Sequence, residues 1–158
     1  MADLTAAQEL RVWGEAFTER YKIETTAAHT IYKGTPMVMD HSNAVSVAVG
    51  SLVPFVAAFV PQVTDVFLGI AAEDKAVAAA QVHDTDIECY VWPTILGFKS
   101  TVFTNGASNG MAVYKDDSNI LVGVASIVGN IRIGDVWRVE DGYCWVKLAE
   151  TFIQAGSV

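Results

Sequence analysis

Residues 131–148 read Ile131-Arg-Ile-Gly-Asp-Val-Trp-Arg-Val-Glu-Asp141-Gly142-Tyr-Cys-Trp-Val-Lys-Leu148, two alternating apolar runs joined by an Asp-Gly pair. An Asp-Gly pair between two such runs is among the strongest short-range signals for a β-hairpin. The same pattern of apolar runs and turns recurs upstream, where the turn clusters are Asn105-Gly106, Ser108-Asn109-Gly110 and Asp116-Asp117-Ser118-Asn119. Short strands at this spacing predict a mainly β domain, built as a small barrel or sandwich of short antiparallel strands.

Further strands are predicted from short apolar runs bounded by turn residues, over residues 30–32, 36–39, 66–70 and 101–104. Residues 86–92 alternate with a period of two, and their apolar side is formed by Ile87, Cys89 and Val91. Residues 73–81 are rich in alanine, which permits one or two helical turns.

The composition suits one folded domain, because 52% of the 158 residues are hydrophobic and only 18% are charged. The chain has 10 Lys and Arg against 18 Asp and Glu, which gives a net charge of -8. It contains no basic run that could neutralise phosphates, so we expect no nucleic-acid partner and no membrane surface as a partner. Cys89 and Cys144 lie in apolar alternation and are expected to pack in a core, although a single disulfide between them is also compatible with the sequence.

One uncharged stretch, residues 42–64, is long enough to span a bilayer. Pro54 and Pro61 interrupt it, and residues 44–49 alternate small or polar with β-branched side chains, which is typical of a strand. We therefore interpret the stretch as two buried strands joined by a Gly-Ser turn, and we expect no membrane span.

Residues 1–28 are predicted to form an N-terminal arm or short helix, ahead of a β-rich domain at residues 29–158. Thr5-Ala-Ala-Gln8 matches a helix capping box, and apolar residues then recur at spacings of three and four: Leu10, Trp13, Phe17 and Tyr21. Gly14 weakens such a helix, so an extended arm is the competing interpretation. The stripe packs either on the protein's own sheet or on a neighbour, and in the second case its four residues are partner contacts and the domain folds without them.

A search for catalytic and metal-binding patterns finds no convincing site. Gly106-Ala-Ser108-Asn-Gly110 fits the G-x-S-x-G spacing of a hydrolase nucleophile, but a strand pattern follows it and the last histidine, His83, precedes the serine. The histidines lack metal-ligand spacing, and the carboxylates of Asp84, Asp86 and Glu88 match a charged strand edge as well as they match a calcium site. We therefore predict no catalytic residue, no metal and no cofactor.

An ordered set of short motifs spans most of the chain. These motifs are Thr30-Ile-Tyr-Lys-Gly34, Phe67-Leu-Gly-Ile-Ala-Ala-Glu-Asp74, Ala112-Val-Tyr-Lys-Asp-Asp117, Ile133-Gly-Asp-Val-Trp137 and Trp145-Val-Lys-Leu148. In this order they resemble the capsid decoration, or cement, proteins of tailed bacteriophages. The apolar insertion at 43–64 and the segment before Glu19 depart from the family pattern.

The resemblance implies a non-enzymatic structural protein on the outer surface of a virus capsid, assembled in the host cytoplasm. Such proteins bind the expanded head, often as homotrimers at local threefold positions, and clamp neighbouring subunits of the major capsid protein. The expected partners are therefore the major capsid protein and further copies of the chain. The alternative is a carbohydrate- or receptor-binding β module of a virion, in which an exposed tryptophan stacks on the ligand: Trp92, Trp137 or Trp145.

Overall fold

The computed structural model describes residues 7–25, 28–40, 51–54, 66–79, 81–100, 103–115, 121–122 and 131–150. These residues form β-strands and one short 3₁₀ helix, η1 (Gly106–Ser108). In chain order the strands are β1 (Leu10–Trp13), β2 (Thr18–Thr25), β3 (His29–Ile31), β4 (Pro36–Asp40), β5 (Ser51–Pro54), β6 (Val66–Ala71), β7 (Lys75–Val77), β8 (Gln81–Tyr90), β9 (Ile95–Lys99), β10 (Ala112–Lys115), β11 (Leu121–Val122), β12 (Ile131–Glu140) and β13 (Tyr143–Leu148).

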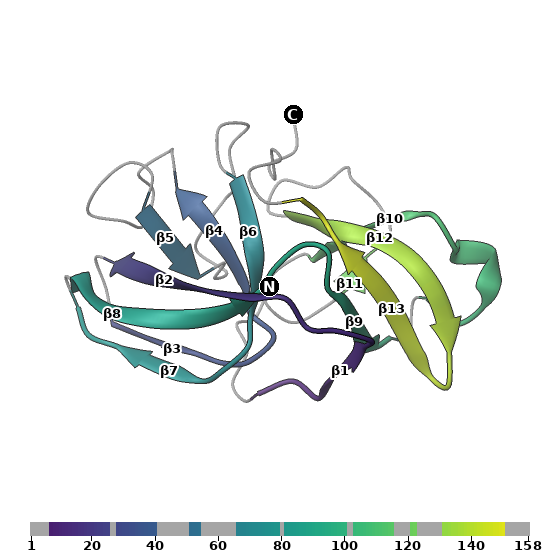
Figure 1. The fold of residues 1–158 in the computed structure, drawn as a ribbon, viewed down its shortest axis with the longest axis horizontal. Coiled ribbons are helices and arrows are strands. Elements are labelled where there is room, and N and C mark those ends of the chain that lie inside the picture. The colour runs from purple at the N-terminus through teal and green to yellow at the C-terminus, as the bar shows by residue number, and fades with distance from the viewer. Residues whose placement is uncertain are drawn as a thin grey trace.

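Six strands form one antiparallel sheet in the order β1-β9-β13-β12-β10-β11, at the right of Figure 1. The predicted hairpin lies at the centre of this sheet, because β12 and β13 pair with each other there. Asp141 and Gly142 form its turn with φ angles of 55° and 77°, and a two-residue type I′ turn requires such positive values at both positions. The hairpin predicted from the Asp-Gly pair is therefore confirmed.

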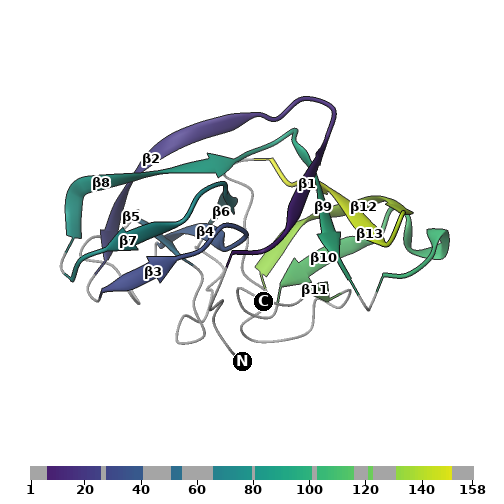
Figure 2. The same ribbon diagram turned by 90° about the horizontal axis from the view of Figure 1, so that it is seen from below.

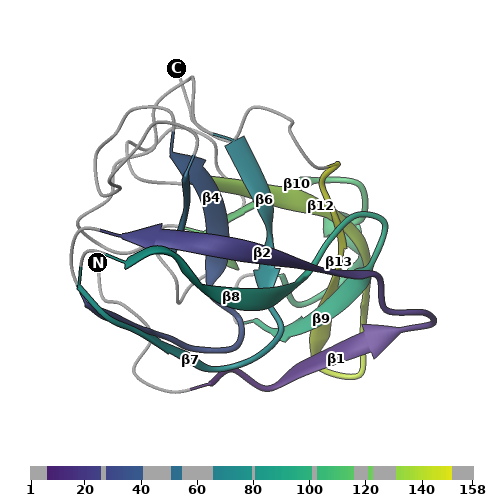
Figure 3. The ribbon, with the colours of Figure 1, turned by 60° about the vertical axis from the view of Figure 1, so that its left-hand side comes forward.

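Five further strands, at the left of Figure 1, pair in the closed order β2-β5-β4-β6-β8. These pairings are antiparallel except that β2 and β5 run parallel, through the pair Ile23↔Leu52. The long ribbon of β2 and β8 passes across β4 and β6 in Figure 3. β3 and β7 pair with each other, so the helical turns predicted for residues 73–81 are wrong: strand pairing overrides the helix preference of alanine.

Two clusters of buried side chains form the core. The first covers the inner face of the six-stranded sheet and also includes Val38 from β4 with Phe67 and Ile70 from β6. The second lies among the five strands of the closed order and includes Ile23 and Leu68. Because the first cluster contains residues of both sheets, the sheets pack as one sandwich-like, mainly β unit, as the sequence predicted.

The two cysteines occupy different clusters. Cys144 belongs to the first cluster and Cys89 to the second, and both are buried, free thiols. Burial raises the pKa of each thiol to about 12, because the thiolate would lose its hydration. Their predicted role as small core hydrophobes is confirmed, and the alternative of a disulfide between them is not realised.

The N-terminal segment is extended, so the short-helix alternative is wrong for residues 10–25. β1 pairs with β9, and β2 pairs with β8, so this segment is built into both sheets of the domain at 29–158. The extended conformation is more stable than a helix here, because each strand satisfies its backbone hydrogen-bonding groups by pairing. An isolated short helix is only marginally stable in water.

β9 was not identified from the sequence, although it lies between β1 and β13. Its central Gly97 weakens the strand signal, since glycine is depleted in strands. The strand predicted at 101–104 is not formed at residues 103–104, and residues 101–102 lie outside the described part of the chain.

The uncharged stretch at 42–64 is described only at β5. The strand predicted at residues 44–49 lies outside the described residues. Among the residues that are described, no helix is both long and apolar enough to cross a membrane.

Candidate interaction surface

The outer face of the six-stranded sheet carries rows of aromatic and charged side chains. The middle row crosses β1, β9, β13 and β12 through Arg11, Gly97, Trp145 and Arg138. The row toward the hairpin turn holds Lys99, Tyr143 and Glu140, and the row on the other side holds Trp13, Ile95, Lys147 and Asp135. We call the following outward set the aromatic–arginine face: Arg11, Trp13, Trp137, Arg138, Tyr143 and Trp145.

Gly97 makes the middle row possible. A Cβ atom at this position would lie 2.9–3.1 Å from three ring atoms of Trp145, closer than the optimal carbon separation of about 3.5–4.0 Å. The indole therefore lies against the glycine, where Trp145 is only 6% exposed. Its Nε1 donates to the carbonyl of Glu140 at 3.4 Å, so Trp145 forms a fixed floor for the face.

The aromatic rings of three strands form one connected cluster. Trp13 from β1 meets Trp137 from β12 and Trp145 from β13 edge-on, with centroid distances of 4.9 and 5.1 Å. Tyr143 and Trp145 follow with a centroid distance of 5.9 Å. Edge-to-face pairs contribute about 0.5–1.5 kcal/mol beyond their buried area, so these contacts help to hold β1 on the sheet.

Both arginines of the middle row lie over aromatic rings. The guanidinium carbon of Arg11 is 4.3 Å from the Tyr143 centroid. The guanidinium carbon of Arg138 is 4.6 Å from the Trp137 centroid and 5.1 Å from that of Trp13. A ring attracts a cation over its face within about 6 Å, so each stack positions a guanidinium group while its N–H donors remain at the edge.

Glu9 fixes the chain just before β1. Its Oε1 accepts a hydrogen bond from the Tyr143 hydroxyl at 2.7 Å, and its Oε2 pairs with the Lys99 ammonium at 2.7 Å. The hydrogen bond from Lys99, followed by that from Tyr143, lowers the pKa of Glu9 below its usual value. The same hydrogen bonds raise the pKa of Lys99 and of Tyr143, so the three groups act as one polar link between β1, β9 and β13.

The three tryptophans considered for stacking on a carbohydrate, Trp92, Trp137 and Trp145, differ in how exposed their rings are. Trp145 is 6% exposed and Arg138 covers a ring face of half-buried Trp137, so neither presents the open ring that stacking on a sugar requires. Trp92 is 44% exposed and is the open one of the three.

A second group of exposed aromatic residues lies where the chain crosses between the sheets. The segment from β1 to β2 and the segment from β8 to β9 run side by side, as Figure 2 shows. Phe17 and Trp92, on these two segments, are 39% and 44% exposed. The Thr94 hydroxyl accepts from the Phe17 N–H at 2.8 Å and donates to its carbonyl at 3.0 Å, which fixes the backbone of Phe17. We call Trp13, Phe17 and Trp92 the crossover ridge.

The four residues predicted for the arm do not share one surface. Leu10 packs against the first core cluster, and Tyr21 packs against the second. Trp13 belongs to the aromatic–arginine face, and Phe17 lies on the crossover ridge. Spacings of three and four would align them on a helix. Here Leu10 and Trp13, three apart on β1, lie on opposite faces, and the segment between β1 and β2 interrupts the alternation before Tyr21. A partner contact stays a prediction for Trp13 and Phe17.

The sequence did not single out Arg11, Arg138 or Tyr143. Their signal was present only as alternation along β1, β12 and β13, because residues two apart on a strand share a face. Which strands are neighbours depends on the pairing of β1 with β9, and no short-range motif indicates it.

Two of the family-like motifs meet at a turn of the fold. The N–H of Gly34 donates to the carbonyl of Ala71 at 2.9 Å, and the Asp74 carboxylate accepts the N–H of Lys33 at 2.8 Å. Gly34 has a φ of 103°, and a Cβ atom there would lie 2.5 Å from the Gln8 side chain, so the position requires glycine. These motif residues therefore build the fold.

One of the carboxylates considered for metal binding, Asp86, is engaged by arginine. Arg20 donates to Asp86 at 2.9 Å and to Glu73 at 3.1 Å, and its hydrogen bond lowers the pKa of Asp86. The side chain of Asp84 lies outside the described residues. Among the side chains that the structure describes, no group of three His, Cys, Asp or Glu is placed to hold a metal ion.

The G-x-S-x-G segment is a turn, as the sequence indicated. Ser108 ends η1, whose first turn is capped by the Asn105 side chain accepting from Ala107 N–H at 2.9 Å. The next element is the strand β10, whereas a nucleophile elbow requires a helix after the serine. The geometry of this serine is therefore that of a turn residue.

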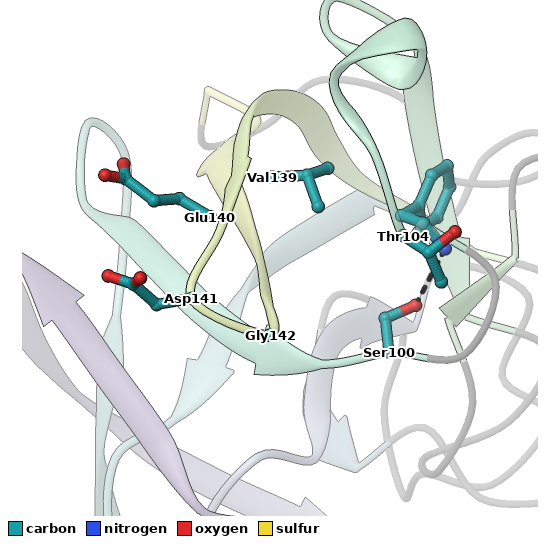
Figure 4. A pocket seen from close by; sticks show the side chains of 7 residues that line it. Ser100, Thr104, Val139, Glu140, Asp141 and Gly142 are labelled. Carbon is teal, nitrogen blue, oxygen red and sulfur yellow. Dashed lines mark hydrogen bonds between the residues drawn. The ribbon is translucent and has the colours of Figure 1, made fainter.

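A hollow of about 210 Å³ lies beside the β12–β13 hairpin, and Figure 4 shows its lining. One side of the hairpin faces the hollow, and Ser100, Thr104 and Val139 lie on that side. The carboxylates of Glu140 and Asp141 lie on the other side and point away from the hollow. The volume is below the range of about 300–1,000 Å³ typical of ligand pockets, so we assign no ligand to this hollow.

Comparisons with protein-family models, with curated proteins and with solved structures find no match to this chain. Its function is therefore inferred from the order of its motifs and from the surfaces described above.

Proposed function

We propose that the chain is a structural capsid decoration protein, which binds the outer surface of an expanded virus head and clamps neighbouring subunits of the major capsid protein. Two features support this function: the ordered motifs between residues 30 and 148, and the aromatic–arginine face. In this role the protein works on the virion surface after assembly in the host cytoplasm, and it needs no catalysis, cofactor, nucleic acid or membrane.

The aromatic–arginine face carries the proposal. Tryptophan and arginine supply a large share of the binding energy at protein interfaces, and this face presents Trp13, Arg11 and Arg138 above the buried rings of Tyr143 and Trp145. The rings and guanidinium groups are held in place before any partner arrives, so docking costs little side-chain entropy. A clamp requires a preordered surface of this kind.

The motif residues support a structural role in a second way. Gly34, Ala71 and Asp74 are used in hydrogen bonds that close turns of the fold. A set of motifs that serves the fold, without a paired acid, base or nucleophile among the described residues, is typical of a structural protein.

A homotrimer on the capsid is part of the same proposal. A closed ring of three copies needs two different patches that complement each other. The aromatic–arginine face and the crossover ridge meet at Trp13, while Phe17 and Trp92 offer apolar area beyond it. In this proposal the aromatic–arginine face binds the shell, and the crossover ridge supplies one of the two patches through which neighbouring copies meet.

The alternative of a carbohydrate- or receptor-binding module has weaker support. Arg138 covers ring faces of both Trp13 and Trp137, which leaves Trp92 as the open stacking surface. A single exposed tryptophan is a small platform for a glycan.

The test mixes the purified protein with expanded heads assembled from the major capsid protein encoded alongside it. We expect saturable co-sedimentation, with density for three copies around local threefold positions in reconstructed heads. Trp13→Ala should weaken binding, whereas Met111→Ala serves as the matched control because Met111 is 45% exposed and lies outside both surfaces. Absence of binding to heads refutes the proposal, and retention on a glycan array would favour the alternative.

A further inference from the structure

We infer that the middle row of the aromatic–arginine face binds carboxylates, with Arg11 and Arg138 each receiving an aspartate or glutamate side chain of a protein partner. The identity of that partner as the capsid shell rests on the proposed function. The chemistry of the site follows from the residues of this chain.

Arg11 presents donors that are largely unused by the residues that the structure describes. Its guanidinium group is held by the stack on Tyr143, and its side chain is 55% exposed. The carboxylate that approaches it among the described residues, Glu9, stays 3.9 Å away, which is too long for a hydrogen bond. Both oxygens of Glu9 are engaged at 2.7 Å, one by Tyr143 and the other by Lys99.

Arg138 complements Arg11 from the opposite end of the row. One of its nitrogens, Nη1, donates to Glu140 at 3.2 Å, and its side chain is 46% exposed. A guanidinium group carries five N–H donors, so one such bond leaves others for a partner.

The two guanidinium groups lie over rings that flank Trp145. Arg11 belongs to β1 but lies over a ring of β13, and Arg138 belongs to β12 but lies over a ring of β1. Tyr143 lies in the row toward the hairpin turn and Trp13 in the row on the other side, so Arg11 and Arg138 lie on opposite sides of the floor that Trp145 forms on Gly97.

The charge of this face differs in sign from that of the rest of the chain. The outward rows carry four cations, Arg11, Lys99, Arg138 and Lys147, against three acids, Glu9, Asp135 and Glu140. This leaves six of the 10 Lys and Arg, and 15 of the 18 Asp and Glu, for the remainder of the sequence. The face is thus complementary to an acidic partner, although the whole protein is acidic.

The stacked geometry selects a carboxylate side chain. A guanidinium group fixed by its flat face can form two parallel N–H···O bonds with one carboxylate. A polyanion such as nucleic acid would bring many charges close to the surrounding acids and be repelled, whereas one aspartate or glutamate brings a single charge. The occupant is therefore an acidic side chain of a protein, with apolar neighbours that pack on Trp13.

The first experiment measures binding to expanded heads by co-sedimentation for the wild type, Arg11→Gln and Lys22→Gln. Both substitutions remove one positive charge from an exposed side chain, but Lys22 lies on β2, away from the face. Removing one partner of a close charge pair at an interface is costly, so we expect Arg11→Gln to weaken binding by at least about tenfold. Lys22→Gln should change it by less than about threefold, and circular dichroism checks that both variants fold.

The second experiment identifies the partner group. Carbodiimide joins an amine to a carboxylate in direct contact, so the Arg11→Lys variant is treated with it while bound to heads. We expect mass spectrometry to find position 11 linked to an aspartate or glutamate of the capsid protein. If wild type binds heads, equal binding by Arg11→Gln and no such link overturn the carboxylate site while the decoration function stands. If wild type itself does not bind heads, both proposals fall.

Discussion

Replacing Gly97 with alanine should displace the floor of the aromatic–arginine face. The added methyl group would meet three ring atoms of Trp145 at 2.9–3.1 Å. The ring would have to retreat by about 0.5–1 Å to restore a normal contact. Trp13, with its centroid 5.1 Å away, and the hydrogen bond from Nε1 to Glu140 both oppose that movement.

The expected cost follows from two opposing effects. Overpacking a filled site costs about 1–3 kcal/mol in the free energy of unfolding. Alanine in place of glycine also restricts the unfolded chain, which returns about 0.4–1 kcal/mol. The difference of the two ranges is about 0–2.6 kcal/mol, so we expect Gly97→Ala to be less stable than the wild type by about 1.3 kcal/mol, the difference of their midpoints.

Gly106→Ala is the matched control, because the nearest atom to a Cβ there is the Asn109 amide nitrogen at 3.7 Å. It should show the effect on the unfolded chain without the clash. Urea unfolding followed by tryptophan fluorescence measures both variants, and near-ultraviolet circular dichroism reports the packing of the rings. If Gly97→Ala matches Gly106→Ala in stability and keeps the wild-type aromatic spectrum, the packing of Trp145 on Gly97 is refuted.

Four further outcomes are expected. A truncation that starts at residue 27 should fail to fold, because it removes β1 and β2 from both sheets; a native circular dichroism spectrum would contradict this. Glu9→Gln should destabilise the protein at neutral pH. Because folding lowers the pKa of Glu9, the ionised carboxylate stabilises the folded state above the unfolded-state pKa. This stabilisation disappears as the pH falls through the folded-state pKa. Urea midpoints of Glu9→Gln and wild type should therefore differ at pH 7 and converge as the pH falls below the lowered folded-state pKa of Glu9. The thiols of Cys89 and Cys144, whose pKa values burial raises to about 12, should react with a thiol reagent at pH 8 only after denaturant is added, and fast labelling of the native protein would show that they are accessible. Ser108→Ala should leave the unfolding midpoint and head binding unchanged, because Ser108 serves as a turn residue, and loss of head binding by a folded variant would count against that role.

Local signals predicted the parts of the fold that depend on local chemistry. The Asp141-Gly142 turn was identifiable because positive φ angles at adjacent positions require particular residues, and the hairpin around it followed. Alternation from Ile87 to Val91 likewise indicated which side chains are buried.

Parts that depend on distant pairing could not be predicted. Leu10, Trp13, Phe17 and Tyr21 have helical spacing, yet pairing of β1 with β9 and of β2 with β8 overrides it. The aromatic–arginine face needs the same long-range register, because its rows exist only when β1 lies beside β9. Gly97 weakens the strand signal of β9 because it has no side chain, and the same lack of a side chain makes room for the Trp145 ring.

The crossover between the sheets also determines the order in which the protein can be completed during synthesis. Phe17 is held by Thr94, a residue 77 positions later, and both β1 and β2 find their neighbours in the segment from β8 to β9. The ribosome makes these first two strands early, but β1 cannot pair with β9, and β2 has only its short parallel pairing with β5, until residues 81–99 have left the exit tunnel. In that interval the nascent chain carries two unpaired strand edges with Trp13 and Phe17 uncovered, a state in which a holding chaperone would be useful.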